Sequence, residues 1–266
     1  MAKIPIGQKA VGDLIKLNVN GNLKKFIVIN QGNPDASVYD SSCDGTWVIT
    51  KDTYGTSDYL LTTNNGYAES TVHTYLNDTF FNLLDSSLKT AIKQVKIPYT
   101  DGNGETGVLK TGTDGLLTKV FLLSRAEVNG SETYWSKTEG VALQYFDVEN
   151  PAEIRIAYGY DYLNRYSTQD WTLRTPDWST SWNIVDEDGS VDSSGDPTSG
   201  IHGRMRPAFI LPSDFEVSDA ISINGYSNIG GTNKELTGEG YVNIGGTLKP
   251  IAESYINIGG TLKSLS

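Results

Sequence analysis

The sequence predicts an α+β fold dominated by short antiparallel strands, followed by a small all-β module at its C-terminal end. The chain of 266 residues contains 28 Gly, 9 Pro and 15 Tyr but only 2 Met, a composition rich in turn and strand formers. Apolar runs flank hairpin signals such as Asn20–Gly21. A short motif recurs three times near the C-terminal end. The length allows one large domain or two smaller ones.

The first part of the chain predicts an antiparallel meander. Strands are expected at 13–19 and 25–30, joined by the Asn20–Gly21 turn, and a third strand is expected at 46–51. A short buried strand is expected at 120–123 because four apolar residues follow one another there.

Helices are expected between these strands. Ser70 is a suitable N-cap for a short helix, and a second helix is expected to start after Asp85 and to stop before Pro98. The apolar side of this second helix is expected to contain Leu88, Ala91, Ile92 and Val95. The segment 124–127 has the S-x-x-E pattern of a capping box and predicts another helix start.

Aromatic and small polar residues alternate from residue 158 to residue 198. The rings are those of Tyr158, Tyr160, Tyr162, Tyr166, Trp171, Trp178 and Trp182. Such a composition is typical of adaptable binding surfaces, but it also suits a loop-rich core, and both interpretations stay open. Trp171, beside Leu173, is expected in the core, whereas Trp178 and Trp182 are expected to be exposed. Short strands are expected at 171–174, 183–186 and 208–211.

Charge and cysteine content exclude several classes of function. With 21 basic and 32 acidic residues the net charge is −11, so neither nucleic acid nor an anionic membrane is an expected partner. The single cysteine, Cys43, excludes an intramolecular disulfide. The N-terminal segment has no apolar core of signal-peptide length, and no apolar run is long enough to span a membrane. We therefore expect a protein made in a cytoplasm.

No catalytic motif emerges from the residues. Cys43 and His73 match no known nucleophile pattern, and Cys43 is expected to be a structural thiol. The acidic residues Glu127, Glu132, Glu139, Asp147 and Glu149 are expected on a solvated surface. Asp186 and Asp188 place carboxylate oxygens, the ligands that calcium prefers, at alternate positions of the segment. The segment lacks the glutamate that an EF-hand requires. A β-turn is expected there, with calcium as the alternative, and no other cofactor is expected.

The C-terminal repeat predicts a separate module. The motif Y-x-N-I-G-G-T begins at Tyr226, Tyr241 and Tyr255, and each copy reads as a strand, a Gly-Gly turn and a return strand. We place the domain boundary between residues 217 and 218. The repeats are expected to mediate assembly through Tyr226, Ile229, Tyr241, Ile244, Tyr255 and Ile258.

Two motifs carry a family resemblance. The segment W-T-L-R-T-P starts at Trp171, and R-P-A-F-I-L starts at Arg206. With Y-D-S-S-C-D-G-T-W at 39–47, they make residues 8–217 resemble a C-type-lectin-like domain family of phages and gut bacteria. The motif residues expected to be structural are Trp171, Leu173, Arg174, Pro176, Arg206 and Pro207. The chain departs from the family pattern at Arg204, where that pattern has glycine.

The resemblance implies a fold similar to that of formylglycine-generating enzymes and of the variable adhesins made by diversity-generating retroelements. The enzymes use a cysteine pair, and a chain with Cys43 alone is closer to the adhesins. The adhesins contact ligands between the two motifs. By position this implies Asp177, Trp178, Ser179, Thr180, Trp182 and Asn183, to which the aromatic segment adds Tyr160 and Tyr162.

The terminal repeats resemble units in tail and fibre proteins of phages that infect Gram-positive bacteria. We therefore expect a non-enzymatic virion protein that recognises a host-surface glycan or protein as a tail-fibre, receptor-binding or head-fibre component. The alternatives are a purely structural capsid-decoration or baseplate protein and a cell-wall glycan hydrolase. Other virion proteins are expected partners, and a homo-oligomer, by analogy a trimer, is expected.

Overall fold

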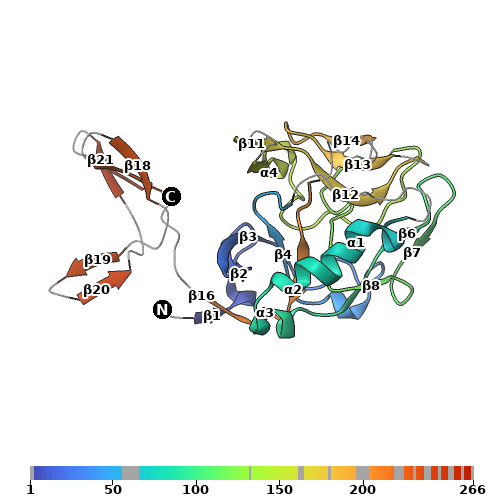
Figure 1. Cartoon of the computed structure of the whole chain (residues 1–266), viewed down its shortest axis with the longest axis horizontal. Coiled ribbons are helices and arrows are strands. Elements are labelled where there is room, and N and C mark those ends of the chain that lie inside the picture. Colours follow the sequence, from blue (N-terminus) through green and yellow to red (C-terminus); the bar gives the residue numbers. More distant parts are fainter. Residues whose placement is uncertain are drawn as a thin grey trace. The chain divides into compact units, whose positions relative to one another are not determined.

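The computed structural model describes residues 3–55, 66–131, 133–160, 165–178, 181–195 and 204–218, together with six strands between residues 225 and 264. The chain divides into two units (Figure 1). One is Pro5–Glu216, and the other is Val217–Ser266 with Met1–Ile4. This division lies beside the boundary expected at 217.

A five-stranded antiparallel sheet organises the larger unit, with strand order β2-β3-β4-β15-β9. Its strands are β2 (Leu14–Val19), β3 (Asn22–Gln31), β4 (Thr46–Thr50), β15 (Ala208–Leu211) and β9 (Val120–Phe121). The first hairpin turns at Asn20 and Gly21, whose φ angles of 51° and 74° fit the two-residue turn that the sequence predicts. The strand at 208–211 pairs with both β4 and β9, so it joins distant parts of the chain.

Smaller sheets surround this one. The two-stranded pairs are β1 (Lys3–Pro5) with β16 (Glu216–Ser218), β5 (Val95–Ile97) with β8 (Leu116–Thr118), β6 (Tyr99–Asp101) with β7 (Val108–Lys110), and β10 (Ala157–Tyr160) with β11 (Tyr166–Gln169). A three-stranded sheet contains β12 (Trp171–Pro176), β13 (Trp182–Val185) and β14 (Val191–Gly195). The fold is therefore mixed and mostly β, which is compatible with the predicted α+β class.

The helices are short. They are α1 (Thr71–Tyr75), which continues through a π-helical turn at Leu76–Phe80 into α2 (Phe81–Leu83), then α3 (Ser86–Ala91) and α4 (Ala152–Arg155). Both predicted N-caps form: Ser70 Oγ accepts from the His73 amide at 3.0 Å, and Asp85 Oδ1 accepts from the Leu88 amide at 2.8 Å. In the part of the chain that the structure describes, none of the helices has the length and apolar character needed to cross a membrane.

The second predicted helix is too long. It ends at Ala91, and Val95 belongs to β5 instead of extending the apolar side of the helix. The reason is tertiary pairing, because Val95 and Ile97 are buried where β5 pairs with β8. A three-residue strand with two β-branched residues fits this sheet better than another helical turn.

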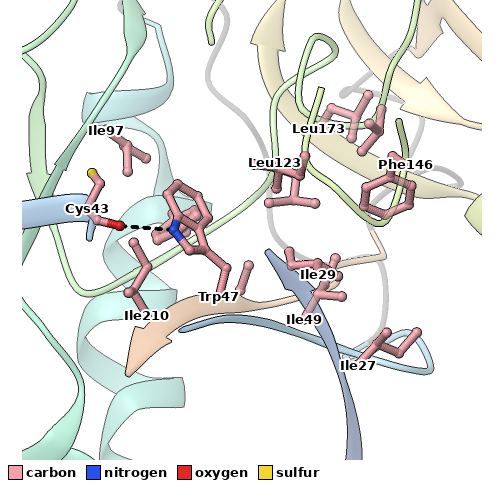
Figure 2. Packing of buried hydrophobic residues seen from close by; sticks show 14 of the residues in the cluster. Ile27, Ile29, Cys43, Trp47, Ile49, Ile97, Leu123, Phe146, Leu173 and Ile210 are labelled. Carbon is pink, nitrogen blue, oxygen red and sulfur yellow. Dashed lines mark hydrogen bonds between the residues drawn. The ribbon is translucent and has the colours of Figure 1, made fainter. Parts of the chain in front are cut away.

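The core of the larger unit gathers residues from the five-stranded sheet, from β5, from β10 and from the β12–β13 strands around Trp47 (Figure 2). The indole Nε1 of Trp47 donates to the Cys43 carbonyl at 3.0 Å, and both side chains are fully buried. The Tyr39 and Phe121 rings meet the Trp47 indole edge-on at 5.6 and 5.5 Å. Trp171 and Leu173 belong to the same cluster, so the expectation that Trp171 is a core residue is confirmed.

The C-terminal unit contains the three predicted hairpins. They are β17 (Gly225–Ile229) with β18 (Thr232–Leu236), β19 (Tyr241–Ile244) with β20 (Thr247–Pro250), and β21 (Tyr255–Ile258) with β22 (Thr261–Ser264). The Gly-Gly pairs and the side chains of the three hairpins lie outside the described residues. The assembly role of its tyrosines and isoleucines therefore stays a prediction.

The Cys43 thiol should be chemically inert in the folded protein. Burial raises its pKa to about 12, and its Sγ contacts the Lys96 carbonyl at 3.2 Å. The thiolate is the reactive form, so at pH 8 we expect labelling by a disulfide reagent to be about a thousandfold slower than in the unfolded chain. Spectrophotometric thiol titration with and without denaturant measures this ratio. Rapid stoichiometric labelling of the native protein would contradict the burial.

Candidate functional site

A buried ionic cluster lies next to the segment after β12, which the sequence predicts to bind ligand. Arg174 of β12 binds Glu127 in a bidentate manner, with Nη1–Oε2 and Nη2–Oε1 distances of 2.6 and 2.7 Å. Its Nε lies 3.7 Å from Oε2 of Glu139, and all three side chains are fully buried. The guanidinium also donates to the carbonyls of Pro98 and Leu122 at 3.0 and 2.9 Å. Arg174 therefore connects β12 to Pro98 and to the stretch of chain between Leu122 and Glu139.

The carboxylates of this cluster are saturated by further donors. Glu127 accepts from the Tyr39 hydroxyl at 3.0 Å. Glu139 accepts from the Thr100 amide at 2.6 Å and from the Thr175 hydroxyl at 2.8 Å. Burial raises the pKa of Glu139, whereas the two carboxylates hold the pKa of Arg174 above its usual value. The cluster is thus a fully paired structural element without a free catalytic oxygen.

The expectation of a solvated acidic surface is wrong for Glu127 and Glu139. Both are fully buried because Arg174 neutralises them in the core. The predicted capping box at Ser124 and Glu127 does form, with amide-to-side-chain distances of 2.9 and 3.1 Å. It closes a turn at 125–129 instead of a helix, because the Glu127 carboxylate also binds Arg174.

A second polar layer follows Arg174 along the chain. The Oδ1 atom of Asp177 accepts from the hydroxyls of Thr133 and Ser136 at 3.0 and 2.9 Å. Asn183 donates to the Ser136 hydroxyl at 2.9 Å and accepts from the Arg125 guanidinium. These bonds tie the 133–136 loop to the segment that joins β12 to β13.

Three aromatic side chains lie on these tied loops and form what we call the aromatic platform: Tyr134, Trp135 and Trp178. Trp178 is 48% exposed and Tyr134 is 87% exposed. The Trp135 ring lies between them, 4.7 Å from Trp178 at 37° and 4.5 Å from Tyr134 at 86°. Exposed rings held by buried polar bonds form a preorganised contact surface.

The structure separates the residues predicted to bind ligand. Trp178 lies on the platform, but Trp182, Asn183 and Asp177 are only 1%, 0% and 5% exposed. The expectation that Trp182 is exposed is wrong: β13 is the central strand between β12 and β14, and all four of its residues are buried. Asp177 and Asn183 support the platform from below. Tyr162, Ser179 and Thr180 lie outside the described residues.

Two platform residues, Tyr134 and Trp135, were not predicted from the sequence. The available signal was the adjacent aromatic pair within the polar run 131–138, which has the same character as the segment around Trp178. The loop is 43 positions or more from Trp178, so only the fold brings the rings together.

The motif residues lie in the interior. The Trp171 indole donates to the Arg155 carbonyl at 3.0 Å, and the Arg206 guanidinium stacks over its ring at 4.7 Å. Arg206 also donates to the Thr50 carbonyl at 3.0 Å. Leu173, Pro176 and Pro207 are buried as well. The two motifs therefore contribute strands and anchors of the core.

Tyr160 belongs to a second group of exposed rings, which we call the tyrosine cluster: Tyr158, Tyr160 and Tyr166 of the β10–β11 hairpin. Their exposed fractions are 43%, 61% and 53%. Tyr166 stacks on Tyr158 at 5.7 Å and tilts against Tyr160 at 5.3 Å. Alternation along β10 places Tyr158 and Tyr160 on the same outer face.

The segment considered for calcium forms a turn. The Gly189 amide donates to the Asp186 carbonyl at 2.9 Å, and the Ser190 amide donates to Oδ1 of Asp188 at 2.8 Å. Among the residues that the structure describes, no group of three or more His, Cys, Asp or Glu side chains is arranged to hold a metal ion.

Comparison with known proteins identifies a family for this region. A family model described as a domain of unknown function, DUF6273, matches residues 44–213. This range contains the Arg174 cluster, the aromatic platform and the tyrosine cluster, and it ends before the terminal hairpins. No curated protein and no solved structure matches the chain significantly.

Replacing Glu127 with Gln should strongly destabilise the fold. The substitution leaves the Arg174 charge with the Glu139 carboxylate alone, 3.7 Å from its Nε. Removing one partner of a buried ion pair lowers the free energy of unfolding by ~3–5 kcal/mol. Urea unfolding followed by tryptophan fluorescence measures this change. Glu153→Gln, at an exposed position of α4, is the matched control and should change stability by less than ~0.5 kcal/mol. Equal stabilities of the two variants would contradict the role of the cluster.

Truncating either tryptophan of the predicted binding segment should lower the free energy of unfolding, but by different amounts. Trp182→Ala removes a buried ring and should cost ~3–5 kcal/mol, because a cavity remains. Trp178→Ala removes a half-exposed ring and should cost at most ~1 kcal/mol. Equilibrium unfolding in urea compares them, and a reversed order would show that the burial pattern is incorrect.

Proposed function

The chain belongs to the DUF6273 family, and from this premise we propose that it is a non-catalytic recognition protein that binds a glycan through its aromatic platform. One observation carries the proposal: Trp178 and Trp135 present partly exposed rings from loops that buried hydrogen bonds hold in place. Rings of this kind provide a large contact area without a large loss of conformational entropy.

The chemistry of the platform favours a sugar as ligand. Aromatic faces pack against the apolar faces of sugar rings, and neighbouring polar groups bind the hydroxyls. The polar side chains of Ser136, Lys137 and Thr138 follow Trp135 directly in the sequence. Since Asp177 and Asn183 already fix the loop, little ordering remains to oppose binding.

We further propose a C-type-lectin-like fold and a place on a phage particle, as a tail-fibre, receptor-binding or head-fibre protein that contacts the host surface. One line of support is the resemblance of the two motifs to the C-type-lectin-like family; their segments form β12 and β15 in the core. The other is the resemblance of the terminal repeats to units of phage fibre proteins. The repeats would join the protein to other copies or to other virion proteins.

The terminal hairpins favour such an assembly role. Among the described strands of this unit, each hairpin pairs only within itself, as three separate two-stranded sheets. Isolated two-stranded hairpins are marginally stable in water. Association with other copies would cover their open edges. The same feature favours a purely structural decoration or baseplate role as the second candidate function.

Truncating Trp178 should weaken ligand binding while the fold persists. We expect Trp178→Ala to lower the binding free energy to host cells or their surface polysaccharide by ~1–3 kcal/mol, the range for a central aromatic anchor. Binding of purified protein to a panel of intact Gram-positive cells measures the effect. Leu117→Ala is the matched control, because Leu117 is 54% exposed on β8 and lies outside the platform.

The result distinguishes the two candidate functions. Selective cell binding that Trp178→Ala loses and Leu117→Ala retains supports recognition through the platform. Cell binding that both variants retain removes the platform from the site. Stable association with particles in the absence of any cell or polysaccharide binding supports the decoration or baseplate role instead.

A further inference from the structure

A pocket of about 130 Å³ lies beside the tyrosine cluster. Its walls include Lys24, Lys25, Thr50, Asp52, Tyr160 and Tyr166. Phe80 and Tyr54 add an apolar part, with their rings edge-on at 4.9 Å. The volume is smaller than the ~300–1,000 Å³ of pockets that enclose drug-sized ligands, so it suits a ligand of about one sugar unit.

The aromatic wall of this pocket is held in place by the backbone. The Thr53 amide donates to the Tyr158 carbonyl at 2.8 Å, which docks β10 against the segment after β4. A Cβ atom at Gly159 would lie 2.0 Å from Oγ1 of Thr53, so glycine permits this close approach. Tyr160 and Tyr166 are directly opposite each other across the β10–β11 hairpin, and both line the pocket with Gly159.

The polar groups of the pocket give it a positive character. Asp52 is its single acidic lining residue, and its Oδ1 accepts from the Tyr166 hydroxyl at 3.1 Å. Among the described residues neither Lys24 nor Lys25 forms an ion pair, and the two lysines outnumber the single carboxylate of the lining. This is a local exception in a chain with a net charge of −11.

A buried hydroxyl of the lining also has no partner. Oγ1 of Thr50 is inaccessible to solvent and makes no hydrogen bond. Buried polar groups are nearly always hydrogen-bonded, and an exception calls for a partner. A ligand in the pocket can supply one only where the Thr50 side chain rotates to expose Oγ1.

We propose that this pocket is a second binding site, separate from the aromatic platform, for a saccharide that carries an anionic group. The rings of Tyr160 and Tyr166 pack on the sugar, and Asp52 accepts from its hydroxyls. Lys24 binds its carboxylate or phosphate, and the adjacent Lys25 adds a second positive charge at the pocket wall. A carboxylate and a phosphate share this chemistry, so the test includes both.

The test uses the full-length, ¹⁵N-labelled protein and three probes: sodium glucuronate, glucose 6-phosphate and neutral methyl glucoside. Amide chemical-shift titrations should locate binding at Lys25, Thr53 and Tyr160. We expect at least one anionic sugar to bind about tenfold more tightly than methyl glucoside, because charge-assisted bonds to lysine add to the ring contacts. The tighter of the two anionic probes identifies the preferred group.

Variants distinguish this site from the platform. The double variant Lys24→Gln/Lys25→Gln should reduce the affinity for the anionic sugars to that of methyl glucoside, and Tyr160→Ala should weaken all three probes. Lys89→Gln on α3 is the matched control and should change nothing. Trp178→Ala should also leave these affinities unchanged, so failure of the glycan function at the platform does not affect this result.

Three outcomes would overturn the proposal. They are equal affinity for the charged and neutral probes, full affinity in the double lysine variant, and an absence of shifts at the pocket amides with both anionic sugars.

Discussion

The structure depends on one buried arginine and the two glutamates that neutralise it. A charge in the protein interior is tolerated only where its partners are held in place. Arg174 therefore fixes the turn that carries Glu127, the loop that carries Glu139 and the carbonyls of Pro98 and Leu122. Thr175, Asp177 and Asn183, which follow it in the chain, are held by buried hydrogen bonds of their own. The position of the aromatic platform at the surface therefore depends on the buried interaction of Arg174 with the two glutamates and on these hydrogen bonds.

This arrangement explains how a loop-rich region can present a defined surface. The described residues 125–131 and 133–139 belong to no helix or strand, yet Arg125, Thr133 and Ser136 are bonded to Asp177 and Asn183 in the interior. Recognition surfaces on loops gain affinity when the loops are ordered before binding. The tyrosine cluster is supported differently, by a hairpin whose glycine lets it dock closely. The larger unit thus carries two aromatic surfaces with different electrostatic surroundings.

Local patterns in the sequence predicted the local structure well. The meander around Asn20–Gly21, the caps at Ser70 and Asp85 and the terminal hairpins all depend on residues close in the chain. The errors arise where distant residues decide. Val95 pairs with β8 instead of extending a helix, and Glu127 meets an arginine 47 positions away. Trp182 is buried because β13 is a central strand, and the rings that join Trp178 come from another loop. No short pattern contains that information.

The most direct measurement is ¹⁹F NMR of the protein labelled with 5-fluorotryptophan, which gives one resonance for each of its five tryptophans. Surface polysaccharide from cells that the protein binds is titrated into the sample. The account predicts that the resonances of Trp135 and Trp178 shift, whereas those of the buried Trp47, Trp171 and Trp182 do not. A polysaccharide that binds while the Trp135 and Trp178 resonances stay unchanged would contradict it.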